Sequence, residues 1–99
     1  MVVSLDGAKV KNRRGLHKYL QRALALPDYY GKNLDALFDC LTDLHEDVEL
    51  VVEHPEALEQ TLGFYARSLN IVLRRASQEN PHLKVTVLSD PAPETADAE

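Results

Sequence analysis

Three short runs of apolar and β-branched residues limit the folds open to this chain of 99 residues. They are "MVVSL" at 1–5, "VELVVE" at 48–53 and "LKVTVLS" at 83–89, and each is typical of a β-strand. "VELVVE" alternates too little to be half-exposed, so we expect both faces of that strand to be covered. Helical patterns separate the runs, and strands that alternate with helices form a parallel sheet with right-handed crossovers. The sequence therefore predicts an α/β fold in which a small three-stranded parallel sheet is packed with about four helices.

The first predicted helix follows the first strand. Leu16, Tyr19, Leu20 and Ala23 recur at helical spacing and share one face, and this helix should end before Pro27. Its basic residues then face water.

A loop, "LPDYYGKN" at 26–33, comes next and ends at Asn33, a favourable N-cap. The second helix should therefore begin at Leu34. Its apolar stripe consists of Leu34, Leu37, Phe38 and Leu41.

Two more helices are predicted in the second half of the chain. "HPEALEQ" at 54–60 is a short helix begun by Pro55, and a longer helix runs from Thr61 to about Glu79. The longer helix is ended by the "NP" pair at 80–81. Its apolar positions are Tyr65, Leu69, Val72 and Ala76.

Residues 1–89 should form one domain, because a chain of this size supports one core. "DPAPETADAE" at 90–99 has no apolar anchor, and we expect a disordered acidic tail there. The opening residues lack the pattern of a signal peptide and no run of eighteen apolar residues occurs, so a cytoplasmic location is expected. The single cysteine, Cys40, excludes an internal disulfide and should be a small buried hydrophobe.

The net charge of −5 is unevenly distributed along the chain. Residues 1–27 hold six Lys and Arg against Asp6 alone, whereas residues 28–60 hold ten Asp and Glu against Lys32 alone. An acidic surface of this density repels nucleic acid and membranes and attracts basic proteins. The charge therefore favours a protein partner, with no nucleic acid and no membrane.

The acidic segment includes a regular row. Asp35, Asp39 and Asp43 recur every four residues, and helical geometry turns them outward together. Outward charges often only interact with water, and Asp35 also lies in the first turn, where a carboxylate favours the helix dipole. Neither explanation fits Asp39, because aspartate in the middle of a helix is a poor helix former and this one stands next to Phe38. Acids placed among aromatic rings are typical of binding surfaces.

Motifs for chemistry are missing from the sequence. It contains no GxxxxGK[ST], GxGxxG, HExxH or paired CxxC, so no metal and no cofactor is expected. A hydrolase that used Asp35 and Asp39 would need a base or metal ligands in the same cleft, and no pattern supplies them. The four histidines each stand alone in the sequence: His17, His45, His54 and His82. We therefore do not expect an enzyme.

The run "LHKYLQRALALPDYYGKNLDALFDCLTD", from Leu16 to Asp43, resembles the barstar family, the inhibitors of the bacterial ribonuclease barnase. A weaker likeness spans residues 1–89, and the family fold agrees with the predicted one. In such proteins the loop and second helix plug the nuclease active site, with Asp39 where a substrate phosphate would sit. The resemblance implies these contacts: Tyr29, Gly31, Asn33, Leu34, Asp35, Phe38, Asp39, Thr42 and Asp43, with Arg75 on the long helix at the rim.

The chain departs from the family at three of these positions. Phe38 replaces the usual tryptophan, Asp43 stands where the family has glycine, and Arg75 falls where an acidic contact would lie. An arginine that faces a basic nuclease opposes binding, where a glutamate would assist it.

Two functions of different kinds stay open. The first is an inhibitor, monomeric when free, that blocks the active site of a basic ribonuclease or nuclease toxin through its acidic helix. The second is a binding module of the same fold, or an immunity protein, for a partner unlike barnase.

Overall fold

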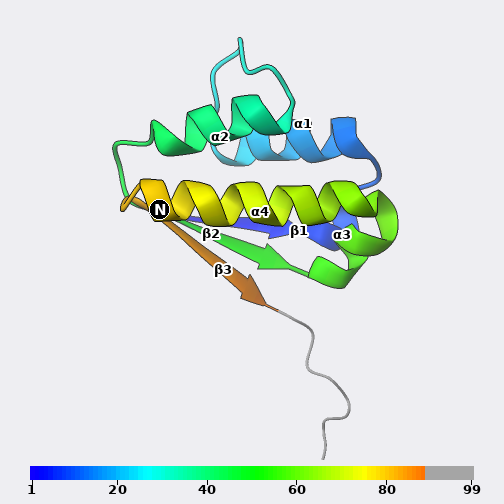
Figure 1. Ribbon diagram of the computed structural model, residues 1–99. Coiled ribbons are helices and arrows are strands. Elements are labelled where there is room, and N and C mark those ends of the chain that lie inside the picture. The colour runs from blue at the N-terminus through cyan, green and yellow to red at the C-terminus, as the bar shows by residue number, and fades with distance from the viewer. Residues whose placement is uncertain (89–99) are drawn as a thin grey trace, which may run out of the picture.

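The three predicted strands form one parallel sheet in the order β1-β2-β3 in the computed structural model, which describes residues 1–88 (Figure 1). Val3 on β1 pairs with Leu50 on β2, and Leu50 pairs with Val85 on β3. The described elements are β1 (Val2–Asp6), the 3-10 helix η1 (Gly7–Lys9), α1 (Arg13–Ala23), α2 (Leu34–Thr42), β2 (Val48–Glu53), α3 (Pro55–Leu62), α4 (Phe64–Glu79) and β3 (Leu83–Leu88). The predicted α/β class and the parallel sheet are confirmed.

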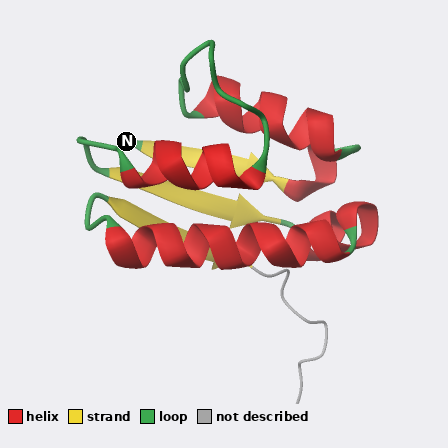
Figure 2. Ribbon diagram, turned by 45° about the horizontal axis from the view of Figure 1, so that its top comes forward, coloured by secondary structure: helices red, strands yellow, loops and turns green. Residues whose placement is uncertain are grey.

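The core lies between the helices and one face of the sheet. Leu50 and Val52 are fully buried on this face, and Figure 2 shows the strands behind the helices. Glu49, Val51 and Glu53 point to the other face and are only half-buried. The expectation that both faces of this strand would be covered is therefore wrong. The helices pack on one face, and the two glutamates occupy outward positions that water can reach.

The first helix, α1, starts and ends where polar and loop residues allow it. Asn12 is the N-cap, and its side-chain oxygen accepts a hydrogen bond of 2.7 Å from the backbone N–H of Gly15. Leu16 and Leu20 are completely buried against the core, as their spacing predicts. The predicted end before the proline of the following loop is confirmed, because α1 stops at Ala23.

A glycine separates α3 from α4. Gly63 has a φ of +59°, a conformation that residues with a Cβ rarely adopt, and the helix axis changes there. The prediction that the long helix starts at Thr61 is wrong, because Thr61 and Leu62 complete α3. The predicted start at Pro55 and the predicted end at Glu79 are confirmed.

Asn80 joins the C-terminal ends of α2 and α4. Its side chain is buried, and its amide nitrogen donates hydrogen bonds to the carbonyl oxygens of Leu41 at 2.9 Å and Leu44 at 3.0 Å. The Leu41 carbonyl also accepts a longer hydrogen bond of 3.4 Å from the backbone N–H of Leu44, and Asn80 adds a shorter one where the regular bonds of α2 end. Beyond ending α4, as predicted, this residue fixes α2 in place.

The predicted tail at 90–99 lies outside the described residues, so the domain boundary at residue 89 stays a prediction. Among residues 1–88, no helix is long and apolar enough to cross a membrane.

Candidate protein-binding site

The acid row lies on the outer side of α2, as its spacing predicts. Asn33 caps the helix, and its side-chain oxygen accepts a 2.7 Å hydrogen bond from the backbone N–H of Ala36. Leu37 and Leu41 are completely buried beneath the helix. The side chains of the acid row are all exposed, at Asp35, Asp39 and Asp43. Asp43 is the C-cap residue, so it lies just beyond the last turn.

The carboxylates of the acid row are not neutralised within the described part of the chain. The ion pairs found there join Arg67 to Glu59 at 4.0 Å and His82 to Asp47 at 2.9 Å, and neither includes a member of the row. An outward row of unpaired negative charge attracts a cationic surface from solution.

Aromatic and apolar side chains lie beside the acids. Tyr29 in the preceding loop is 87% exposed, an unusual state for a large ring. Leu34 and Phe38 are half-buried, so part of each side chain is available on the surface of α2. An open hollow of about 360 Å³, called the acidic hollow below, lies between the loop and the helix. Its lining consists of Tyr29, Asp39, Cys40, Thr42 and Asp43.

Cys40 is half-buried in this hollow, so the prediction of a buried small hydrophobe holds only in part. Burial raises the pKa of its thiol, and the charges of Asp39 and Asp43 raise it further. A thiol with a raised pKa stays protonated and is a weak nucleophile. Cys40 therefore contributes packing rather than chemistry.

Three other predicted contacts shape the loop and helix from within. The Thr42 hydroxyl donates to the carbonyl oxygen of Phe38 at 2.9 Å, and the Asn33 amide donates to that of Gly31 at 3.3 Å. A Cβ on Gly31 would lie 3.3 Å from the Cβ of Ala36, closer than most side chains approach. These residues hold the surface in shape as well as lying on it.

Arg75 is exposed on α4. The neighbouring Arg74 lines a hollow with Val85 and Val87, so it marks the side of α4 that faces β3. In Figure 1, α2 lies above α4 and β3 below it. Arg75 follows Arg74 by one residue, about 100° around the helix, so the two side chains point in different directions. No ion pair between Arg75 and Glu79 forms in the described residues. Arg75 therefore has an exposed charge without an ion-pair partner among the described residues.

A buried histidine anchors the loop, and sequence reasoning missed it. His17 is 1% exposed, and its Nδ1 lies 2.6 Å from the hydroxyl of Tyr30. Its Nε2 lies 2.5 Å from the hydroxyl of Tyr65 on α4. Tyr30 follows the exposed Tyr29, so α1 and α4 together hold the loop that presents the Tyr29 ring. The one available signal was the position of His17 between Leu16 and Leu20 on the buried face of α1.

The protonation of this cluster follows from its burial. Burial lowers the pKa of His17 and raises the pKa of Tyr30, with Cys40 and Tyr65 adding to the increase. Burial also raises the pKa of Tyr65, against the opposing charge of Arg13. Near neutral pH the imidazole is neutral and both phenols keep their protons. One tyrosine then donates to His17 and the other accepts from it.

Stability is expected to fall as the pH drops below the ordinary histidine pKa of 6.5. The unfolded chain then binds a proton at His17 that the folded chain resists, so the stabilisation present above pH 6.5 is lost as the pH falls through the lowered folded pKa. Urea unfolding between about pH 5 and pH 8 measures this loss. His17→Gln should remove most of it, and His45→Gln, at an exposed histidine outside the ion pairs of the described residues, should not. An equal pH dependence in both variants would assign the loss to other groups.

The arrangement offers a binding surface rather than reactive groups. Among the described residues, no three His, Cys, Asp or Glu gather where they could hold a metal ion. The lining of the acidic hollow contains neither histidine nor lysine. Fold and site together define a small α/β domain with an exposed acidic surface on α2.

Comparison with known proteins identifies the family of this domain. The family model described as Barstar (barnase inhibitor) matches residues 1–89, and the chain belongs to the barstar family. Members of this family are inhibitors and not enzymes, which confirms that prediction. A relative from Bacillus subtilis (strain 168), YrdF, is named as a candidate ribonuclease inhibitor. It is 40% identical over 78 residues, which cover 78% of this chain and 86% of the relative.

Proposed function

We propose that this protein inhibits a basic ribonuclease by covering its active site with α2 and the loop before it. The observation that carries the proposal is the exposed, unpaired acid row on α2, beside the exposed ring of Tyr29. The barstar family and the name of the Bacillus relative support a ribonuclease as the partner. Such an inhibitor, or immunity protein, would act in the cytoplasm, where an unblocked ribonuclease reaches cellular RNA.

Asp39 is the central contact in this proposal. A ribonuclease site holds cationic groups that bind the phosphate of RNA, and a carboxylate can accept charge-assisted hydrogen bonds from the same groups. Asp39 lines the acidic hollow together with Tyr29 and Asp43, so its carboxylate lies near an aromatic ring and a second carboxylate. Asp35 and Asp43 lie one turn to either side and extend the negative field. The inhibitor would therefore occupy the place of substrate without reacting.

A titration of ribonuclease activity tests the proposal. Barnase is the first target, because the family description names it. Added inhibitor should reduce RNA cleavage linearly, to almost nothing at one equivalent. Full activity at a large excess of this protein, against barnase and against the ribonucleases of its own source, would reject the proposal.

Arg75 favours a second candidate function, a partner other than barnase. Its charge is exposed, and at the rim position proposed for it a charge acts mainly on the association rate. Asp43 adds a further negative charge that the family pattern lacks. A partner with an acid facing Arg75 and a base facing Asp43 would match both residues.

Arg75→Glu should speed association with barnase several-fold at low salt, because it replaces a like charge with an attracting one. Stopped-flow or surface-binding rates measure the change. Arg74→Glu is the matched control, since it makes the same change of charge on the side of α4 that faces β3. Equal rates for the two variants would place Arg75 outside the interface. A slower rate with the native partner would identify an acid opposite Arg75.

A further inference from the structure

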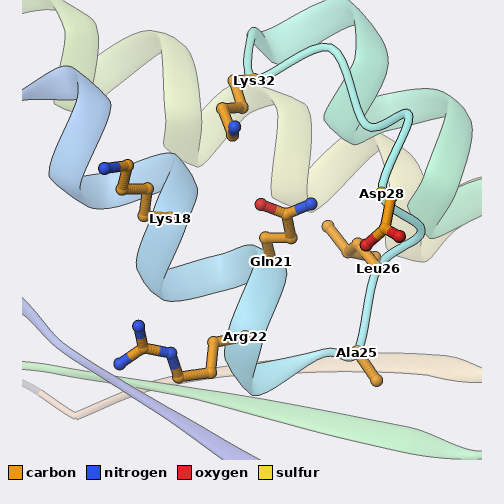
Figure 3. A pocket seen from close by; sticks show the side chains of 7 residues that line it. All are labelled: Lys18, Gln21, Arg22, Ala25, Leu26, Asp28 and Lys32. Atoms are coloured by element: carbon orange, nitrogen blue, oxygen red, sulfur yellow. The ribbon is translucent and has the colours of Figure 1, made fainter.

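A second hollow, of about 470 Å³, lies between α1 and the loop that follows it (Figure 3). Its volume falls within the range of small-molecule pockets, roughly 300–1,000 Å³. No member of the acid row lines it. Its lining consists of Lys18, Gln21, Arg22, Ala25, Leu26, Asp28 and Lys32.

Positive charge gathers on one side of this hollow. In Figure 3, Lys18, Arg22 and Lys32 lie on one side of Gln21, and Asp28 lies on the other. None of the three cations takes part in the ion pairs of the described residues. Cations that face one hollow repel each other, and an anion placed between them relieves that repulsion.

The arrangement on α1 is unfavourable for the helix itself. Arg14, Lys18 and Arg22 follow at four-residue intervals, all exposed, and like charges one turn apart destabilise a helix. The row is the basic counterpart of the acid row on α2. This basic row also supplies part of the positive charge of residues 1–27. The proposed inhibition of a basic ribonuclease assigns no role to that charge.

The backbone of the loop is also held in an unfavourable shape. Lys32 has a φ of +56° and Ala25 a φ of +53°, in the left-handed region that residues other than glycine avoid. Between them, the Gln21 amide donates a 3.1 Å hydrogen bond to the carbonyl oxygen of Pro27, which ties the loop to α1. Strained backbone of this kind concentrates at functional sites. Here it places Lys32 on the same hollow as the two cations of α1.

We propose that this hollow binds a small phosphate-bearing molecule. The guanidinium of Arg22 suits two phosphate oxygens at once, and the ammonium groups of Lys18 and Lys32 supply point charges around them. Ala25 and Leu26 form an apolar part of the lining on the Asp28 side of Gln21, where an organic group attached to the phosphate can pack. A free oligophosphate and a nucleotide share this chemistry.

Titration of the full-length protein with pyrophosphate at low ionic strength tests the proposal. Backbone amide shifts in NMR spectra should saturate and concentrate at Lys18, Gln21 and Lys32. The double variant Lys18→Gln/Lys32→Gln should weaken the dissociation constant at least about tenfold, since it removes two of the three cations. Tighter binding of a nucleoside diphosphate would identify a nucleotide as the ligand, and equal binding an oligophosphate.

Two control variants distinguish binding at this hollow from nonspecific attraction of pyrophosphate to positive charge elsewhere on the protein. Lys84→Gln changes an exposed lysine on β3 and should alter pyrophosphate binding less than about twofold. Asp39→Ala should also leave it unchanged, so the outcome does not depend on ribonuclease inhibition. Shifts that fail to saturate, or an equal loss in Lys84→Gln and the double variant, would overturn the proposal. Thermal melts of each variant show whether it remains folded.

Discussion

Asp39→Ala is expected to weaken binding to a basic ribonuclease by at least about thirtyfold, the scale of an interface hot spot. Asp39 lies on the acidic hollow beside Tyr29, and binding would remove water from its carboxylate while cations of the nuclease surround it. Removing the carboxylate leaves those buried cations without a partner, which is the costly outcome. The ranking follows the family, because barstar's own aspartate is the established example of such a hot spot. Inhibition constants for wild type and variant measure the loss.

Asp35→Ala and Asp43→Ala are the matched controls for this prediction. Each removes the same charge about one turn away, Asp35 in the first turn of α2 and Asp43 at its C-cap, where we place the edge of the proposed contact. Rim charges alter association rates more than affinity, so their losses should be smaller. Equal small losses at all three positions would mean that the acid row only interacts with water.

Tyr30→Ala is expected to lower the free energy of unfolding by about 3–5 kcal/mol, the range for losing a buried aromatic ring. Tyr30 is 5% exposed, and its hydroxyl is paired with Nδ1 of the buried His17. Tyr30→Phe keeps the ring but leaves that nitrogen without its partner, which costs roughly 1–3 kcal/mol. Urea unfolding at pH 7 measures both values.

The adjacent tyrosine gives the opposite expectation. Tyr29 is 87% exposed, so Tyr29→Ala should change stability by less than about 0.5 kcal/mol while weakening inhibition. Wild-type stability in Tyr30→Phe would show that the hydrogen bond to His17 contributes nothing. A large loss of stability in Tyr29→Ala would show that the loop is held differently.

The local sequence pattern predicted most of the helices and strands. It failed where the structure depends on a backbone angle or on how the layers of the fold pack. The strand at 48–53 follows from a run of apolar and β-branched residues, and the start of the helix at Leu34 follows from a cap. Both are properties of neighbouring residues. The break between α3 and α4 was predicted at 60–61 instead of at Gly63, because the apolar pattern continues through both places and only the backbone angle marks the true one. The open face of β2 was missed because a run of β-branched residues does not record how many layers cover it.

The same division applies to the candidate site. The outward placement of Asp35, Asp39 and Asp43 follows from helical spacing alone and is confirmed. The cluster around His17 was not predictable in this way, because Tyr30 and Tyr65 lie 13 and 48 residues away along the chain. Such contacts depend on how α1 and α4 pack around the loop, which no periodicity records.

Inhibition of barnase at increasing sodium chloride tests most directly whether the acid row binds a ribonuclease. Salt screens opposite charges, so the inhibition constant of the wild type should weaken at least about tenfold between about 0.05 M and about 0.5 M salt. Barstar and barnase are themselves the standard example of such steering, so this expectation comes from the family. The variant with Asp35, Asp39 and Asp43 all changed to Asn should inhibit far more weakly and show a much flatter dependence on salt. An inhibition constant indifferent to salt, or equal salt dependence in wild type and variant, would contradict the account.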